Sequence, residues 1–268
     1  MADLRVLTLN LWARHGDWHR RRDVLAAGIR ELAPDLVAAQ EVLVEDGYDQ
    51  LADVVGDGFH VVHQTGGHDG LRAVSVASRW PVGRVREADL RVTDRIGTYP
   101  CATLLVEVLA PAPLGRIILA NHGPAWQWWA EAERERQAVA TARAVEELVG
   151  ELPGHVVAAG DFNAEPGAAS MRFWTGRQSF DGLSVAYRDA WESARGGAQG
   201  WTFDPRNPLT AVDEPGLDRG RRIDYVLVRC TDHGPTLRVR DTCLAFSQDV
   251  AGVWASDHFG VVADLALP

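Results

Sequence analysis

The sequence predicts an α/β fold in which two β-sheets pack face to face and helices cover their outer faces. Three observations lead to this prediction. Short apolar segments of strand length recur along the chain, and a few longer segments with helical periodicity lie between them. Stretches rich in Gly and Pro are no longer than loops, and no linker, repeat or low-complexity tract divides the chain. We therefore expect residues 1–268 to form a single domain.

The first half of the chain is expected to consist mainly of strands. A strand over 4–12 precedes a helix over 17–32, which must end before Pro34 because proline cannot continue a helix. A short buried strand over 35–40 ends at Glu41. The later strands of this half are expected over 59–63, 71–79, 84–92, 102–109 and 116–121.

The second half opens with the longest expected helix, over 128–148. Ala138, Ala142, Val145 and Val149 recur there at the spacing of one helix face, while charged residues fall on the other face. The remaining strands are expected over 155–159, 223–229, 236–243 and 261–265, with shorter helices over 168–175 and 186–194.

Composition excludes several kinds of chemistry. The chain is 46% hydrophobic and 24% charged, which is the balance of a globular protein with a sizeable core. All 27 Lys+Arg positions are Arg, so Schiff-base chemistry on a lysine, the lysine of a phosphate-binding P-loop and a Ser-x-x-Lys nucleophile pair are excluded. The net charge of −10 argues against non-specific binding of duplex DNA, leaves a local basic groove open, and is compatible with a site that gathers divalent cations.

Cysteine content and the N-terminal segment indicate a compartment. Cys101, Cys230 and Cys243 show no paired spacing, so neither a disulfide framework nor a structural zinc site is expected. The first residues pass directly into a strand without the features of a leader, and no segment approaches the roughly 20 apolar residues of a membrane helix. We expect no transmembrane segment and a cytoplasmic protein, unless a leader has been removed.

Polar residues lie at the ends of apolar strands at several points of the chain, after the strand in most cases and, for Asp257 and His258, before the last expected strand. Each one alone is explained by a turn or a cap, because Asn and Asp favour those positions. Together they form an inventory of oxygen donors and two imidazoles, which suits Mg²⁺ or Mn²⁺ better than Zn²⁺ and favours metal-assisted displacement at phosphorus. The residues concerned are Asn10, Glu41, Asn121, His122, Asp161, Asn163, Asp257 and His258.

The same segments, taken in order, form a set of motifs. They are Leu7-Thr8-Leu9-Asn10-Leu11-Trp12, Gln40-Glu41-Val42, Ser78-Arg79-Trp80-Pro81, Asn121-His122-Gly123-Pro124, Gly160-Asp161-Phe162-Asn163, Arg222-Ile223-Asp224-Tyr225 and Ser256-Asp257-His258. This ordered set resembles the endonuclease/exonuclease/phosphatase superfamily of Mg²⁺-dependent phosphoesterases. The resemblance implies a four-layer α/β/β/α sandwich of two mixed sheets, with the active site at one edge of the sheets.

The resemblance also implies roles for individual residues. Glu41 is expected to be the main metal ligand, and Asn10 and Asp257 are expected to complete or orient the metal shell. His258 corresponds to the catalytic histidine, and Asp224 to the carboxylate that fixes its tautomer. The implied cofactor is Mg²⁺ or Mn²⁺.

Three further residues take roles from the same resemblance. Asp161 is expected to orient or deprotonate the attacking water, and Asn163 to hold that water or a phosphoryl oxygen. His122 corresponds to a second active-site histidine that donates to phosphoryl oxygens.

Substrate contacts are where the sequence departs from the family. A Gly-Asn pair that many members carry before the Ser-Arg-Trp-Pro segment is absent, so its contact is either missing or replaced, with Arg72 as the candidate replacement. Trp126 is expected at the rim of the site, with Trp128 and Trp129 either beside it or packed under the long helix. Arg222, in a cluster with Arg219 and Arg221, is a third candidate, and the alternative for that cluster is a solvated loop paired with Asp213, Glu214 and Asp218.

The function expected is hydrolysis of a phosphodiester or phosphomonoester by in-line attack of water. A nuclease is the alternative within this class, and a catalytically silent binding module on the same fold is the alternative outside it. The partner is a phosphoester, whether a small molecule, a lipid headgroup or a nucleic acid. The stretch Trp201-Thr202-Phe203-Asp204-Pro205 with Asn207 resembles a segment of neutral sphingomyelinase-like members, and the sequence does not indicate an oligomeric state.

Overall fold

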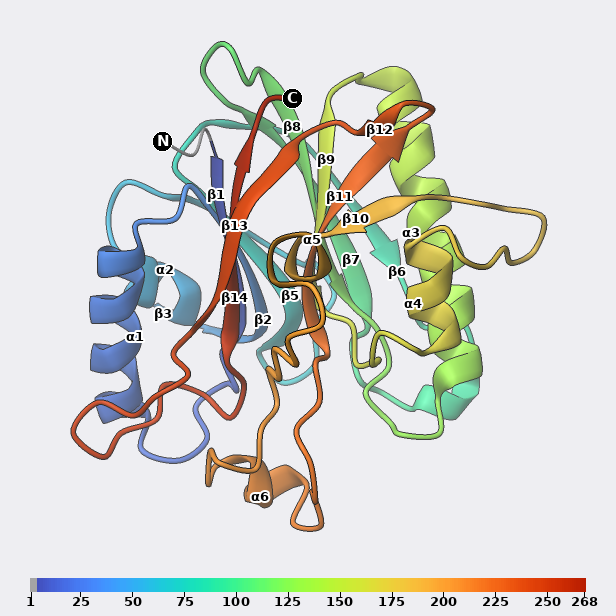
Figure 1. The fold of residues 1–268 in the computed structure, drawn as a ribbon. Helices are drawn as coiled ribbons and strands as arrows, with labels where there is room; N and C mark the ends of the chain where they lie inside the picture. Colours follow the sequence, from blue (N-terminus) through green and yellow to red (C-terminus); the bar gives the residue numbers. More distant parts are fainter. Residues whose placement is uncertain (1–3) are drawn as a thin grey trace.

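The computed structural model describes residues 4–268, so residues 1–3, which open the expected domain, lie outside the described part. Two sheets face each other at the centre of the molecule (Figure 1). Helices α1 (Trp18–Leu32) and α2 (Gln50–Val55) cover the outer face of one sheet, and α3 (Glu131–Glu151) and α4 (Ala169–Trp174) cover the outer face of the other. This arrangement confirms the predicted four-layer α/β sandwich.

The first sheet is built around the N-terminal strand. Its order is β13 (Arg238–Ala245), β14 (Gly260–Ala266), β1 (Leu4–Asn10), β2 (Leu36–Glu45), β5 (Leu71–Ser78) and β4 (His60–His63), and β3 (Tyr48–Asp49) pairs with β2. β1 and β2 are parallel and the other pairs are antiparallel, so the sheet is mixed.

The second sheet has the same general plan. Its order is β10 (Tyr187–Asp189), β11 (Asp224–Thr231), β9 (His155–Asp161), β8 (Arg116–Gly123), β7 (Ala102–Leu109) and β6 (Val82–Asp89), and β12 (Gly234–Pro235) pairs with β11. β8 and β9 are parallel. Their carboxyl ends therefore lie at one edge of the sheet, next to the amino end of the antiparallel strand β11.

The alternation of side chains along each strand decides which of them face the space between the two sheets. Along β1, Val6 packs between the two sheets while Leu7 and Leu9 face the helix α1. Along β9, Val157 and Ala159 likewise face the other sheet. Asn10, Asp161 and Asp224 continue these inward-facing rows to the strand ends. The period of two therefore brings three polar side chains to one end of the space between the sheets.

The N-terminal helix follows the sequence prediction closely. The Asp17 side chain accepts a hydrogen bond from the backbone N–H of Arg20 and caps the first turn. The helix ends at Leu32, where Ala33 takes a left-handed conformation directly before Pro34. The long helix α3 begins at Glu131 rather than at 128, because residues 128–130 form a turn in front of it.

One expected helix is partly wrong. Residues 187–189 of the helix expected over 186–194 form β10, because they pair with β11, and only Ala190–Arg195 is helical (α5). Asp189 separates the two by accepting hydrogen bonds from the backbone N–H groups of Trp191 and Glu192. Neither α2 nor the short elements η1 (Asp94–Ile96), α6 (Thr210–Asp213), β3 and β12 were predicted.

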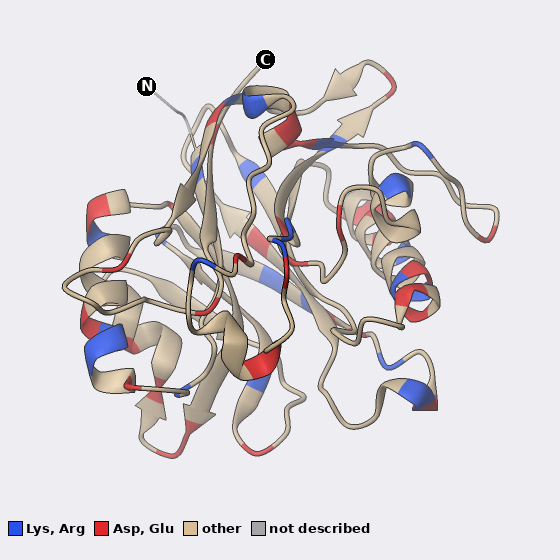
Figure 2. Cartoon of the chain, turned by 60° about the horizontal axis from the view of Figure 1, so that its bottom comes forward, with Lys and Arg blue, Asp and Glu red and all other residues tan. Residues whose placement is uncertain are grey.

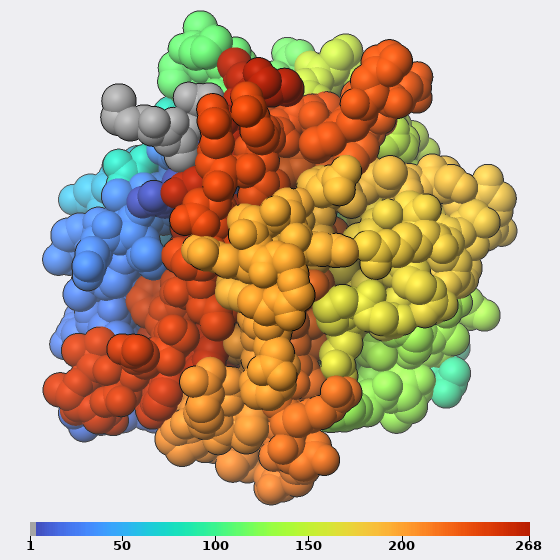
Figure 3. All heavy atoms as spheres, in the orientation of Figure 1, coloured from blue at the N-terminus to red at the C-terminus, as the bar shows by residue number. Residues whose placement is uncertain are grey.

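The chain between α5 and β11 makes a long excursion over the surface. In the space-filling view it runs, coloured yellow to orange, down the front of the molecule towards α6 (Figure 3). α6 projects at the end of the sandwich where β1 finishes and β11 begins (Figure 1). Within residues 4–268, no helix combines the length and the apolar character that crossing a membrane requires.

Candidate active site

Four segments meet at one end of the space between the two sheets, where β1 and β9 finish and β11 begins. Asn10 ends β1, Asp161 ends β9, and Asp224 begins β11 directly opposite Asp161 in the strand register. The segment Ser256–His258 precedes β14 and reaches back to β1, where Ser256 Oγ donates to the carbonyl of Asn10 at 2.7 Å. The site therefore joins both sheets and both ends of the chain.

His258 lies between two carboxylates. Its Nδ1 is 3.0 Å from Asp224 Oδ2, and its Nε2 is 3.9 Å from Asp161 Oδ2. Like charges directly opposite each other on neighbouring strands are destabilising, so the opposed pair Asp161 and Asp224 needs a cation between them. The imidazole of His258 occupies that position.

The charges of these groups are strongly coupled. Burial disfavours a charged His258, but the charges of Asp224, Asp257 and Asp161 overcome it and raise the pKa of the imidazole well above its usual value. This shift favours the protonated imidazole, whose Nδ1–H Asp224 can accept. Burial, together with the charge of Asp224, raises the pKa of Asp161 to about 7.

Glu41 is held by a strained backbone. It lies in the middle of β2 with a φ of 51°, in the left-handed region, although its neighbours stay in register, Gln40 opposite Val74 and Val42 opposite Arg72. Such a conformation costs a non-glycine residue about 1–3 kcal/mol and is concentrated at functional sites. The strand therefore keeps its pairing while the direction of the Glu41 side chain changes.

Glu41, Asn10 and Asp257 form the oxygen-rich side of the site. The Asn10 amide donates to Asp161 Oδ2 at 3.3 Å and is also hydrogen bonded to Glu41. Burial raises the pKa of Glu41, and it raises the pKa of Asp257 to about 7. The site thus concentrates carboxylates whose ionised forms lack enough positive charge nearby.

This donor set fits a hard divalent cation. Two carboxylates and an amide are oxygen ligands of the kind that Mg²⁺ and Mn²⁺ prefer, and a cation would supply the charge that the raised pKa values show to be missing. The acidic and histidine ligand atoms that lie within 4.8 Å of one another are instead those of Asp161, Asp224 and His258. His258 Nδ1 already lies within hydrogen-bond distance of Asp224, so this trio is distinct from the oxygen donors Glu41, Asn10 and Asp257.

These groups surround a cavity of about 260 Å³. Asn163 reaches its wall from the turn after β9, where the backbone N–H of Asn163 donates to Asp161 Oδ1 at 3.0 Å. The cavity is lined by Trp12, His15, Glu41, Tyr99, Trp126, Asp161, Asn163, Phe203, Asp213, Glu214, Arg221, Ile223, Asp257 and His258. Five of the eight residues predicted as catalytic or metal-binding thus line one cavity, and Asn10 and Asp224 are hydrogen bonded to them.

His122 is the predicted catalytic residue whose side chain neither lines the cavity nor is hydrogen bonded to a residue that does. It is 1% exposed and faces the helix layer, where Nδ1 lies 2.7 Å from Thr103 Oγ1. Its ring packs against the edges of Phe162 and Trp174. Burial lowers the pKa of His122 to about 3, so the imidazole is neutral. Its strand neighbour Asn121 faces inwards instead and accepts from Gln40 Nε2 at 2.7 Å, which links the two sheets.

Two of the three predicted substrate contacts also lie away from the cavity wall. Arg72 is on β5, with Nη1 3.5 Å from the carbonyl of Leu71. Arg222 is buried and forms an ion pair with Asp189 at 2.7 Å. Arg221, its neighbour, faces the cavity, where it pairs with Glu214 at 2.5 Å. The ion pairing weighed for this cluster is therefore present.

Two of the three tryptophans, Trp126 and Trp128, lie at or beside the cavity, which is one of the two arrangements weighed for them. Trp126, Trp128 and Trp129 are 54%, 60% and 53% exposed, so none of them is packed under the helix. Trp126 lines the cavity. The Trp128 ring lies 4.1 Å from the Arg221 guanidinium, and its Nε1 donates to Glu214 at 3.0 Å. One aromatic side chain therefore faces the cavity and a second supports its rim.

Sequence reasoning missed the residues that hold the site together. Thr202 Oγ1 accepts from the backbone N–H groups of Ile223 and Asp224 at 3.1 and 3.2 Å. Asn207 Nδ2 donates to the carbonyls of Ser256 and Asp257 at 2.7 and 3.1 Å. Thr202 and Asn207 belong to the stretch compared above with sphingomyelinase-like members. These bonds show that the stretch positions the segments of Asp224 and His258.

Arg21 is a second missed residue. It is 2% exposed and donates to four backbone carbonyls, those of Leu11, Ala13, His15 and Ala255. The loop after β1 and the segment before Ser256 are therefore tied to one side chain on α1. The signal available in the sequence was one arginine among several in a helix, which does not distinguish this role.

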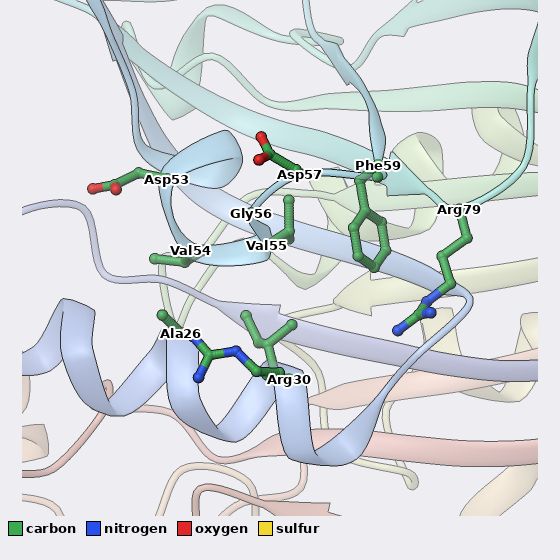
Figure 4. Close-up of a pocket in the computed structure, with 11 residues that line it drawn as sticks. Ala26, Arg30, Asp53, Val54, Val55, Gly56, Asp57, Phe59 and Arg79 are labelled. Carbon is green, nitrogen blue, oxygen red and sulfur yellow. The ribbon is translucent and has the colours of Figure 1, made fainter.

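Another cavity, of about 520 Å³, lies between α1 and the residues that follow α2. Figure 4 shows Arg30, Asp53, Asp57, Phe59 and Arg79 around it. It contains none of the predicted site residues. The carboxylates that line it, those of Asp53 and Asp57, are not buried, unlike those of the cavity at the strand ends.

Comparison with known proteins identifies the family. Residues 7–258 match the model of the endonuclease/exonuclease/phosphatase family. The chain belongs to this family. Its members are hydrolases that act on phosphoester bonds, and they typically use a divalent metal. A search of curated proteins finds no match.

Solved structures of the family share the fold. Truncated TDP2 of Caenorhabditis elegans is 19% identical with a TM-score of 0.75, over 99% of this chain and 98% of that chain. D. rerio TDP2 complexed with single strand DNA product is 19% identical with a TM-score of 0.74, over 98% of both chains. An endonuclease/exonuclease/phosphatase from Bacteroides vulgatus is 20% identical with a TM-score of 0.73, over 99% of both chains.

Proposed function

We propose that this protein hydrolyses a phosphodiester, or a phosphomonoester, by in-line attack of water at phosphorus. Glu41, Asn10 and Asp257 would hold a divalent cation, Mg²⁺ or Mn²⁺. That cation would neutralise charge on the phosphoryl group and activate water when bound. The observation that carries the proposal is the position of His258 between Asp224 and Asp161, beside these oxygen donors.

Each of these side chains has a task in the reaction. Asp161, with its pKa of about 7, is suited to take a proton from the attacking water near neutral pH. His258, fixed by Asp224, would donate from Nε2 to a phosphoryl oxygen and stabilise the charge that develops there. Asn163 would hold the water or a second phosphoryl oxygen. As the new P–O bond forms, the P–O bond to the leaving group breaks, and the leaving oxygen gains a proton.

The walls of the cavity favour a small phosphoester over a polynucleotide. Arg221 is the one arginine on the described wall, and Glu214 neutralises it, while Asp213 adds a further negative charge. Figure 2 shows arginine positions scattered among acidic ones over this end of the molecule, with no basic stripe. A polyanion needs such a stripe to be held along its backbone.

A nuclease is the second candidate. A structure with the same fold, D. rerio TDP2, is complexed with a single strand DNA product, which supports a nucleic-acid substrate. A single strand requires fewer backbone contacts than a duplex, and the exposed Trp126 offers a surface on which a base could stack.

The test is a substrate panel measured after removal of metal with EDTA and again after addition of Mg²⁺ or Mn²⁺. The panel contains bis-p-nitrophenyl phosphate, single-stranded and duplex DNA, sphingomyelin and inositol phosphates. Glu41→Ala should abolish activity and Mn²⁺ binding by calorimetry. Glu45→Ala is the matched control, because Glu45 lies on the same strand, is exposed and pairs with Arg14.

The outcomes separate the alternatives. Activity that survives EDTA and Glu41→Ala would overturn the proposed chemistry. Failure to bind Mg²⁺ or Mn²⁺ would favour a silent binding module, against which the complete set of acidic and histidine side chains argues. Turnover of single-stranded DNA at a higher kcat/KM than bis-p-nitrophenyl phosphate would favour the nuclease.

A further inference from the structure

The proposed chemistry needs neutral or positive donors for the phosphoryl oxygens, and few are present. His122, which the family resemblance assigns to this task, is neutral, and its Nδ1 faces Thr103 on the helix side of β8. Arg221 is paired with Glu214. The indole N–H of Trp12 is donated to Asp213 at 2.8 Å. Apart from the exposed side chains of His15 and Trp126, one side-chain donor on the cavity wall has no assigned task.

That donor is the hydroxyl of Tyr99. Tyr99 lines the cavity together with Glu41, Asp161, Asn163 and His258. Within residues 4–268, its hydroxyl makes no hydrogen bond to any side chain or backbone group. A phenol O–H without a protein partner is available to whatever enters the cavity.

The position of Tyr99 is well supported by its surroundings. It lies between η1 and β7, in a turn closed by a 2.8 Å hydrogen bond from the Cys101 N–H to the Tyr99 carbonyl. The next carbonyl, that of Pro100, accepts from Gln64 Nε2 at 2.8 Å. The Tyr99 ring packs against a buried apolar cluster that includes Leu90 and Ile96. The ring is therefore fixed while the hydroxyl end stays open.

The electrostatic setting keeps this hydroxyl protonated. Burial, with the charges of Glu41 and Asp161, raises the pKa of Tyr99 well above 10. At neutral pH the group is a donor and cannot act as a base. The hydroxyl shares the cavity wall with Glu41 and Asp161, at the centre of the proposed reaction.

We propose that Tyr99 is a further catalytic residue, which donates its O–H to a non-bridging oxygen of the phosphoryl group during hydrolysis. The inference rests on the proposed function. Tyr99 would share with His258 the charge on the phosphoryl oxygens, in the place that the resemblance gives to His122. The donation involves no proton transfer, so its effect is the same for good and poor leaving groups.

The experiment compares Tyr99→Phe with the unmodified protein on two substrates, bis-p-nitrophenyl phosphate and a phenyl analogue with a poorer leaving group. Loss of one such donor should lower kcat/KM by about 10- to 100-fold on both substrates. Mn²⁺ affinity, measured by calorimetry, should stay within twofold, because Tyr99 is not a metal ligand. Tyr48→Phe is the control, since the Tyr48 hydroxyl is bonded to Trp18 and Asp53 away from the cavity.

Three results would overturn the inference. They are a loss of less than threefold in Tyr99→Phe, a loss confined to the poorer leaving group, and a loss of Mn²⁺ binding equal to the loss of activity. Orthovanadate binding to the Mn²⁺-loaded protein gives a readout that does not need turnover, and Tyr99→Phe should weaken it at least fivefold. If the unmodified protein is active and Tyr99→Phe is equally active, only the role of Tyr99 is refuted. If the unmodified protein neither binds Mn²⁺ nor hydrolyses any substrate, the proposed function itself is refuted.

Discussion

Replacing Arg21 by methionine should destabilise the protein by an amount that follows from its contacts. Four carbonyls lose their donor, and two of them, those of Leu11 and Ala255, are bonded in fully buried surroundings. An unpaired buried carbonyl costs about 1–3 kcal/mol. The carbonyls of Ala13 and His15 are only partly buried, so water can replace the guanidinium there.

Part of this cost is recovered when the charge leaves the interior. Burial lowers the pKa of Arg21 to about 10, which shows that the guanidinium is poorly solvated. We expect the free energy of unfolding to fall by about 3 kcal/mol. Arg21→Lys should lose less, because an ammonium keeps the charge and some of the bonds but lacks the planar fork.

Urea unfolding of metal-free protein, followed by tryptophan fluorescence, measures this change. Arg20→Met is the matched control, because Arg20 is exposed and its one bond to a carbonyl, that of Ala251, is 3.3 Å long. The control should stay within about 0.5 kcal/mol of the parent. A loss below 1 kcal/mol in Arg21→Met would refute the reasoning, since it would show that the loops around the site do not depend on this side chain.

Three other predictions concern the charges of the site. Burial raises the pKa of Asp161 and of Asp257 to about 7, above 3.8 in the unfolded chain, so the folded state binds more protons. Metal-free protein should therefore lose stability as pH rises from about 4 to about 7, and added Mg²⁺ should restore it; a flat Tm across this range would contradict the burial argument. Asp224→Asn should lower kcat by about 1,000-fold and move the alkaline limb of the pH–rate profile to lower pH, because His258 loses its partner; a loss under tenfold would count against the pair. Asp213→Ala removes the acceptor of the Trp12 indole N–H and should loosen α6, so that trypsin cleaves the chain between α5 and β11 about fivefold faster in limited proteolysis. An unchanged rate would show that the bond between Trp12 and Asp213 does not hold this part of the chain in place.

The strand ends were the part of the site that sequence could predict. Asn10, Glu41 and Asp161 each follow an apolar run, and the carboxyl ends of parallel strands meet at one edge. The pattern also placed Asp224 near Asp161 through the family motifs. Local sequence is sufficient there because the strand and its polar end are contiguous in the chain.

The direction of neighbouring side chains was not predictable in the same way. Asn121 and His122 must point to opposite faces of β8, but both faces of that strand are apolar, so the sequence does not say which of them faces inwards. Arg221 and Arg222 present the same ambiguity at the start of β11. The structure resolves both cases through partners distant in the sequence, such as Gln40 for Asn121.

Residues whose position depends on partners distant in the sequence showed no recognisable local pattern. Tyr99 lies in a loop between two strands of the second sheet, and its nearness to Glu41 depends on how the sheets face each other. The failure of the expected helix over 186–194 has a related cause. Tyr187 and its neighbours have a partner strand, β11, that lies about 40 positions further along the chain.

The bond between Ser256 and Asn10 has a consequence for how the protein is made. Asn10 leaves the ribosome well before Ser256, Asp257 and His258, because Ser256 follows it by 246 positions. β14, which holds them against β1, is synthesised later still. A nascent chain therefore cannot assemble the site, however much of the second sheet has already folded. The proposed activity is therefore expected only from chains that include β14, and a chain that stops before β14 should lack it.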